Sequence, residues 1–423
     1  MKTVAQLAGR IALILAGLLL PLLLLELGVR VLGLAPPPQP NPAIWQPHPL
    51  FGWWHIPYSG GTFHSDYNEF ASDVHINARG LRDREIGYDN PDGALRVLSL
   101  ADSFGEALQV NLEDTYHKQL EGLLADSLGR PVQVLNAGVG GWGTDQEAIF
   151  YLAEGFRYEP EVVLLAFFIR NDAVNNYGPL EIERNGGRQQ KEFFTLAADG
   201  ALVPPPVQEN VTDGTTVNPQ KTEPATAPPL LGVADALWRW SALYRFVMPY
   251  LRDIPAVVQA VGRSGILGGE AVIRATNPTT PIPFFVYQNP PSPEFEAAWA
   301  LTEAILSGLR DEVAKRGSKL VVVLVAAPEQ VYPAQWDQTV AHNPALQSLV
   351  WDLDAPNRRL NDFLQRENIS HLDLLPIFRQ AAAQPETPPL HFQHDQHWTA
   401  AGHRLAAEAI HQFLLEQGVG NEN

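Results

Sequence analysis

Short, almost continuously apolar runs alternate with amphipathic segments in two stretches of the chain. The apolar runs are 96–100, 132–135, 162–169, 319–325 and 369–374, and the helical segments are 112–128, 144–156, 292–316, 357–366 and 399–417. Runs of this length are typical of strands covered on both faces. Their alternation with helices predicts an α/β protein with a five-stranded parallel sheet in a flavodoxin-like three-layer sandwich. Thr144 and Glu147 have the spacing of a capping box, which places the start of the second helix at Thr144.

Two regions break this alternation. Residues 43–90 are rich in Trp, Phe, Tyr and His, and they predict a small β-rich N-terminal cap. From 178 to 290 the pattern is irregular, with a Thr/Pro/Asn-rich loop at 211–229 and a helix at 234–251, so we expect an insertion that partly covers the site. The predicted order is a targeting segment 1–35, linker and cap 36–90, core 91–178, insertion 179–317 and core 318–423. The insertion is also a candidate surface for a protein partner.

The N-terminal segment has the features of a membrane signal anchor. Lys2 and Arg10 precede the apolar run 11–25, which places the N-terminus in the cytoplasm and the remaining chain outside it. A cleaved signal peptide is the alternative, but the small residues Gly33 and Ala35 are followed by three prolines, a poor cleavage context. The expected location is therefore the cell membrane, with one span and an extracytoplasmic catalytic part.

Charge and composition exclude several classes of function. The net charge of −18 argues against nucleic acid as a partner, since nucleic-acid-binding proteins are basic. The absence of cysteine removes disulfides, thiolate metal sites and a thiol nucleophile. The histidines of the cap follow no metal-ligand spacing, and no metal or cofactor is expected.

Three side chains that could form a catalytic site lie at the ends of predicted elements: a serine follows a strand, and a histidine and an aspartate precede the last helix. Ser103 lies just past the first strand, at the edge where α/β sheets build their sites. His397 lies before the last helix and can serve as the base that a serine nucleophile needs. Asp395 can orient the imidazole, and His394 and His403 are alternative bases. The competing interpretation is that Ser103 caps a helix and that the histidines belong to a surface loop.

Acyl transfer also needs hydrogen-bond donors for the developing oxyanion. The glycines of 136–141 follow the second strand and allow a tight turn that aims a backbone N–H at the site. Asn171 follows the third strand and can offer its side-chain amide. A phosphate-binding loop and a helix cap are the alternatives for these two segments.

Four segments, in their order along the chain, resemble the four blocks of the SGNH (GDSL-type) hydrolase superfamily. They are Ala101-Asp102-Ser103, Asn136 to Gly141, Arg170-Asn171-Asp172 and the segment around His397. The resemblance covers 91–178 and 318–417. It implies Ser103 as nucleophile and the N–H groups of Ser103, Gly141 and Asn171 as the oxyanion hole. Ala101 departs from the usual glycine. Asp395-Gln-His397-Trp is similar to the motif of the alginate O-acetyltransferase-like branch, where it precedes the serine rather than following it.

Three functions follow from the resemblance. The first is an extracytoplasmic serine esterase acting on O-acyl esters, acetyl esters above all, of carbohydrates or small molecules. The second is an O-acyltransferase for cell-surface polysaccharide. The third is a non-catalytic glycan-binding or scaffold module on the same sandwich.

Overall fold

The computed structural model describes residues 2–205, 228–276, 282–343 and 346–420, and it forms two compact units. The larger unit contains residues 42–63, 72–222 and 279–423, and the smaller one contains 1–41, 64–71 and 223–278. Each unit is described below by itself.

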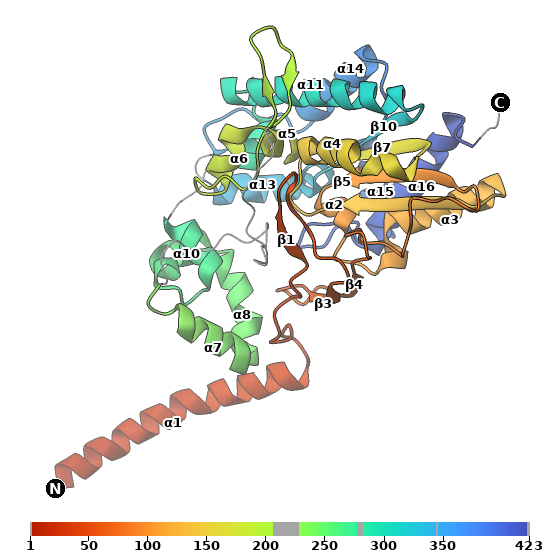
Figure 1. Ribbon diagram of the computed structural model, residues 1–423. Helices are drawn as coiled ribbons and strands as arrows, with labels where there is room; N and C mark the ends of the chain where they lie inside the picture. Colours follow the sequence, from red (N-terminus) through yellow and green to blue (C-terminus); the bar gives the residue numbers. More distant parts are fainter. Residues whose placement is uncertain (1, 206–227, 277–281, 344–345, 421–423) are drawn as a thin grey trace. The chain divides into compact units, whose positions relative to one another are not determined.

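The larger unit is built on a five-stranded parallel sheet of the predicted flavodoxin-like order (Figure 1). Its strands are β5 (Leu95–Ala101), β6 (Val132–Gly138), β7 (Val162–Phe168), β10 (Lys319–Val325) and β11 (Ser370–Asp373). Their spatial order, β11-β10-β7-β5-β6, places the first strand of the sheet between the second and the third. The α/β three-layer prediction is therefore confirmed.

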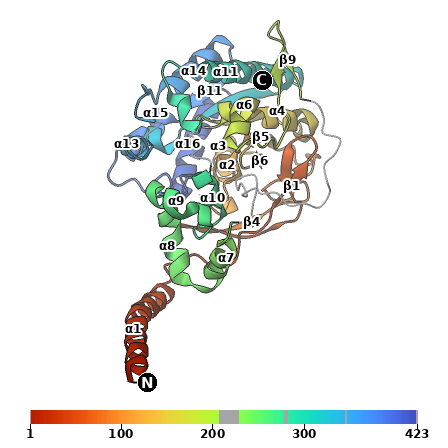
Figure 2. The ribbon, with the colours of Figure 1, turned by 90° about the vertical axis from the view of Figure 1, so that its left-hand side faces the viewer.

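Helices cover both faces of this sheet. Those of the larger unit are α2 (Ser103–Glu106), α3 (Tyr116–Leu128), α4 (Thr144–Ala153), α5 (Asp172–Asn176), α6 (Gly178–Arg184), α11 (Pro293–Lys315), α12 (Pro328–Val331), α13 (Pro333–His342), α14 (Ala355–Arg366), α15 (Leu375–Ala382) and α16 (Ala400–Glu416), with 3₁₀ turns η1 (Leu112–Asp114), η2 (Gly155–Tyr158) and η4 (Ile282–Tyr287). Figure 1 shows α11 and α14 on one side of the sheet, and α3 and α16 pack against each other on the opposite face (Figure 2).

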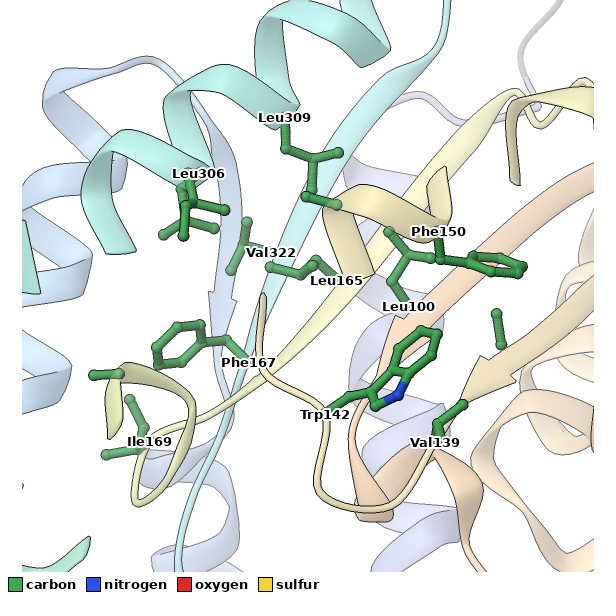
Figure 3. Packing of buried hydrophobic residues seen from close by; sticks show 14 of the residues in the cluster. Leu100, Val139, Trp142, Phe150, Leu165, Phe167, Ile169, Leu306, Leu309 and Val322 are labelled. Atoms are coloured by element: carbon green, nitrogen blue, oxygen red, sulfur yellow. The ribbon is translucent and has the colours of Figure 1, made fainter. Parts of the chain in front are cut away.

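Alternate residues of β5, β6, β7 and β10 enter different cores, as expected for strands buried on both faces. On β7, Leu165 and Phe167 lie in the core with Leu306 and Leu309 of α11 (Figure 3), whereas Leu164 packs in the core on the other face. The continuous apolar character of the strands has this two-sided burial as its cause.

The aromatic residues of 43–90 are used mainly for packing. The cap consists of two strand pairs: the antiparallel pair β1 (Trp45–His48) with β2 (Gly52–His55), and β3 (Gly60–His64) with β4 (Ala71–His75). Phe51 and Trp54 are buried, and their rings contact those of Trp142 and Phe150. The cap therefore shares an apolar core with the sheet.

Two local predictions need correction. The second helix is capped by Gly143 rather than Thr144: the Gly143 N–H donates to Oε1 of Gln146 at 3.3 Å, and the α-helix ends at Ala153. The helix predicted at 234–251 is two helices, α7 (Leu231–Trp240) and α8 (Ala242–Arg252). They separate at Ser241, whose extended backbone and side-chain bond to Tyr244 N start a new helix.

The predicted insertion is divided between the two units. Residues 179–222 and 279–317 lie in the larger unit, where β8 (Thr195–Leu196) and β9 (Leu202–Val203) form a hairpin. The predicted loop at 211–229 lies outside the described residues, except for 228 and 229. That the insertion covers the site stays a prediction.

The smaller unit contains α1 (Lys2–Val31), α7, α8, α9 (Pro255–Val261), η3 (Gly262–Ser264) and α10 (Gly269–Thr276). Glu26 of α1 accepts hydrogen bonds from Ala242 N and Leu243 N, both at 2.9 Å, at the start of α8. Within the part of the chain that the structure describes, no helix meets the length and hydropathy of a membrane span.

Candidate active site

Ser103 begins a four-residue helix directly after β5, the strand between β7 and β6. Asp102 is its N-cap, and the Asp102 Oδ1 accepts a hydrogen bond from Phe104 N at 2.9 Å. Two glycines let this helix approach the strands closely. A Cβ on Gly138 would lie 2.4 Å from Glu106 N, and one on Gly105 would lie 2.3 Å from the Cβ of Ala101. The position of Ser103 thus depends on close packing behind it.

The structure brings Ser103, His397 and Asp395 together. The Nε2 of His397 lies 2.8 Å from Ser103 Oγ, and its Nδ1 lies 2.7 Å from Asp395 Oδ1. Both His397 and Asp395 come from the loop between α15 and α16, and α16 has Thr399 as its N-cap. This chain of hydroxyl, imidazole and carboxylate is the arrangement that activates a serine nucleophile.

Electrostatics distinguishes His397 from the neighbouring histidines. Burial disfavours its charged form, but the carboxylates of Asp395 and Asp102 outweigh burial and raise the pKa of His397 above its usual value. Burial lowers the pKa of His391 and that of His403 to about 3. His403, an alternative base in the sequence, accepts instead from Tyr116 N at 3.3 Å. His397 alone of these three favours the imidazolium that forms when serine gives up its proton.

Asn171 is linked to the nucleophile by a hydrogen bond to Asp102, the residue before Ser103. Its Nδ2 donates to Asp102 Oδ2 at 3.3 Å, and it is the N-cap of α5. An amide nitrogen carries two hydrogens, so a second one is available for an oxyanion. The structure therefore connects the block after β7 directly to the block that holds Ser103.

Gly141 lies in the loop after β6 with φ of +79°, a conformation that favours glycine. Its carbonyl accepts from Asn175 Nδ2 at 3.0 Å, and Trp53 of the cap donates to the neighbouring Gly140 carbonyl at 3.1 Å. This loop begins beside Ser103, because Val139 N donates to Ala101 O at 3.1 Å. The structure thus places the loop of Gly141 next to the turn that carries the nucleophile.

Buried acids lie behind the nucleophile. Asp102, Glu147 and Asp172 are fully buried, and burial raises the pKa of all three. Asp172 Oδ2 accepts from Phe168 N at 2.9 Å, which fixes the end of β7. The mutual repulsion of these carboxylates adds to burial and raises the pKa values of Glu147 and Asp172 further.

Sequence reasoning missed two groups of contacts at the site. Glu106, three residues after Ser103, accepts from Trp45 Nε1 and lies against His55 Nε2, both at 2.7 Å. Arg170 bonds to Gln396 in the loop of His397. Each contact joins segments far apart in the chain, and neither follows a motif. The one sequence signal for these contacts is an unusual residue next to a motif residue, such as Arg170 directly before Asn171.

A flavodoxin-like sandwich with a Ser-His-Asp constellation beyond its strand ends is the arrangement of a serine enzyme, an esterase or an O-acyltransferase. In agreement, residues 286–423 match the family model described as "SGNH hydrolase-like domain, acetyltransferase AlgX". This confirms the resemblance to the SGNH superfamily and to its alginate acetyltransferase-like branch.

Solved structures of similar description were also found. A single-residue variant of Axe2, an acetyl-xylooligosaccharide esterase from a Geobacillus species, is 12% identical, with a TM-score of 0.37, covering 77% of this chain and 96% of that one. A GDSL-like lipase from Bacteroides thetaiotaomicron is 8% identical, with a TM-score of 0.33, covering 76% and 89%. Likenesses this distant carry no detail of substrate. A search of curated proteins found no match.

Proposed function

We propose that the chain is a serine esterase that removes acetyl groups from carbohydrate esters through an acyl-enzyme, with Ser103 as nucleophile. The observation that carries this proposal is the hydrogen-bonded chain from Ser103 Oγ through His397 to Asp395, at 2.8 and 2.7 Å. The acetyl group is proposed because residues 286–423 match an acetyltransferase domain.

In the first half of the reaction, Ser103 Oγ attacks the ester carbonyl carbon while His397 Nε2 accepts the hydroxyl proton. Asp395 stabilises the imidazolium that results. The carbonyl oxygen gains a negative charge and receives hydrogen bonds from the N–H groups of Ser103 and Gly141 and from the Asn171 amide. The C–O bond to the leaving alcohol then breaks, and His397 returns its proton to that oxygen.

In the second half, water attacks the acyl-serine, His397 again moves the proton, and acetate leaves. When a sugar hydroxyl replaces water, the same steps transfer the acetyl group, which makes the chain an O-acyltransferase. The match to an acetyltransferase family favours this second function. Transfer and hydrolysis differ only in the acceptor.

Release of 4-nitrophenol from 4-nitrophenyl acetate tests the shared chemistry. Ser103→Ala is expected to abolish the activity and the labelling by a fluorophosphonate probe. Ser127→Ala is a matched control, because the hydroxyl of Ser127 lies 2.8 Å from His411 Nε2 on the surface. Equal rates for wild type and Ser103→Ala would exclude the serine mechanism and favour a non-catalytic glycan-binding or scaffold module. Product analysis with an oligosaccharide acceptor then separates transfer from hydrolysis.

The proposal extends to a membrane anchor formed by α1, with the catalytic unit outside the cytoplasm. It is supported by the basic residues Lys2 and Arg10 at the start and by exposed leucines along α1, among them Leu18 at 61% and Leu23 at 64%. Mass spectrometry of the mature N-terminus and extraction by detergent but not by carbonate test it. A mature chain that begins near Pro36 would overturn the anchor and leave the enzymatic proposal intact.

A further inference from the structure

The side chain of Arg170 connects two loops of the site. Its Nη1 donates to Gln396 Oε1 at 2.9 Å and lies 3.2 Å from Glu329 Oε2. Arg170 directly precedes Asn171, whereas Gln396 lies between Asp395 and His397. A single side chain therefore joins the loop of the oxyanion donor to the loop of the base.

Gln396 has a backbone conformation that an L-residue rarely adopts. Its φ is +70°, in the left-handed region. The turn lets the Asp395 carboxylate reach both His397 N, at 3.3 Å, and His397 Nδ1, at 2.7 Å. A residue held in this region depends on its surroundings to keep it there.

The contacts around Gln396 supply that support. Its N–H donates to Phe392 O at 3.2 Å, and Phe392 N donates to His397 O at 2.9 Å. The bond from Arg170 fixes the side chain of Gln396 from the opposite side of the loop. The Asp395 carboxylate and the His397 imidazole, on either side of Gln396, are then held in one orientation.

Arg170 is itself held in place. The exposed fraction of its side chain is 19% and that of Glu329 is 4%, so the ion pair is largely shielded from water. Glu329 Oε1 also accepts from the buried hydroxyl of Tyr287 at 3.0 Å. The charge of Arg170 is thus already paired, which favours a role within the protein over binding of a substrate anion.

We propose that Arg170 is a positioning residue that holds Gln396 in its left-handed conformation and thereby sets the Asp395–His397 pair against Ser103. The inference rests on the proposed acyl-transfer function. Arg170 also opposes protonation of His397, whereas Asp395 and Asp102 favour it. Among the described residues, the neutral His391 and His403 also interact electrostatically with the imidazole.

A double-mutant cycle with 4-nitrophenyl acetate tests the inference. Arg170→Gln is expected to lower kcat about tenfold with little change in KM, and Gln396→Gly is expected to lower it about threefold, because glycine adopts the left-handed conformation without support. In the Gln396→Gly background, Arg170→Gln should cost less than about threefold, since coupled residues are not additive. Arg184→Gln is the control, because within the described residues Arg184 forms a local pair with Glu181 on α6.

A tenfold loss in both backgrounds would overturn the proposal, as would a loss that lies entirely in KM. Histidine ¹⁵N NMR gives a readout independent of turnover. In Arg170→Gln the pKa of the His397 imidazole should be lower than in wild type, because the Asp395 carboxylate that raises it is no longer held in place, whereas loss of the Arg170 charge alone would raise it. An unchanged or higher pKa of His397 would also overturn it. Wild-type protein without Ser103-dependent activity would refute the proposed function instead, and the NMR titration would still decide the role of Arg170.

Discussion

The Nε2 of His397 lies 2.8 Å from the Oγ of Ser103, although 294 residues separate them in the chain. This proximity follows from the topology. Ser103 ends the turn after β5, the first strand of the sheet, and His397 precedes α16, the last helix, which packs against α3. In a doubly wound sheet the loops beyond the strand ends meet at one edge, so the first and last blocks of the sequence lie side by side.

The raised pKa of His397 predicts the pH dependence of the reaction. Only the neutral imidazole can accept the proton of Ser103, and the carboxylates of Asp395 and Asp102 hold the pKa of His397 above 6.5. We therefore expect kcat/KM to fall as pH is lowered, with a midpoint above 6.5. The pH profile of 4-nitrophenyl acetate hydrolysis checks this, and a midpoint below 6.5 would contradict the assigned electrostatics.

Asp395→Asn extends that measurement. The amide keeps the shape of the side chain but removes the charge that stabilises imidazolium, so kcat should fall by roughly 10²- to 10⁴-fold. The acid limb of the profile should also move to lower pH, because the pKa of His397 loses its main support. Asp337→Asn, at an exposed position of α13, is the control and should leave both quantities unchanged. A loss of rate without a shift of the profile would assign Asp395 a purely steric role.

Asn171→Ala tests the oxyanion hole. It removes the amide proposed to stabilise the tetrahedral intermediate, and the expected loss in kcat is about 10²- to 10³-fold with KM nearly constant. The same change removes the bond to Oδ2 of Asp102, whose other carboxylate oxygen, Oδ1, caps the nucleophile helix. Fluorescence-detected unfolding separates the two effects. A large loss of stability with a small loss of kcat would show that Asn171 acts mainly as a structural link.

Much of the fold and part of the site could be predicted from the sequence, since both leave local signals. Strands buried on both faces are continuously apolar, as 162–168 and 319–325 are, and a residue such as Ser103 directly after a strand lies at the functional edge. The helix cap at Thr399 is equally local. The break between two helices at Ser241 could not be predicted, because the segments on both sides have the same helical spacing of apolar residues.

The contacts that hold the site in place could not be predicted. The bonds from Trp45 and His55 to Glu106, and from Arg170 to Gln396, join residues between 51 and 226 positions apart. Nothing in the local pattern at Glu106 distinguishes a buried acceptor from an exposed acid. Such pairings are set by tertiary packing, which one sequence does not reveal.

Glu106→Ala is expected to destabilise the larger unit strongly. Glu106 is fully buried, and its removal leaves the Trp45 N–H without its acceptor and His55 Nε2 without its partner. Breaking a buried pair in this way costs about 3–5 kcal/mol. Glu113→Ala is the control, because its pair with Arg84 is exposed at the surface and such pairs contribute about 0–1 kcal/mol. Urea unfolding of the full chain measures both, and equal midpoints would show that the cap contributes no stability through Glu106.

Gly138→Ala tests whether close packing positions the nucleophile. The added Cβ would lie 2.4 Å from both Glu106 N and Gly105 C, so α2 must move by a fraction of an ångström or more. A displacement of that size at Ser103 is expected to lower kcat by about tenfold or more, since reactive geometry tolerates little error. In Gly122→Ala, the control, the new methyl meets nothing within 4 Å on α3, and replacing a helical glycine stabilises by up to about 1 kcal/mol. The unfolding midpoint should therefore fall in Gly138→Ala and rise in Gly122→Ala, and only Gly138→Ala should lose activity. Full activity in Gly138→Ala would mean that the loop after β6 can shift without disturbing Ser103, and that the glycine is required for folding alone.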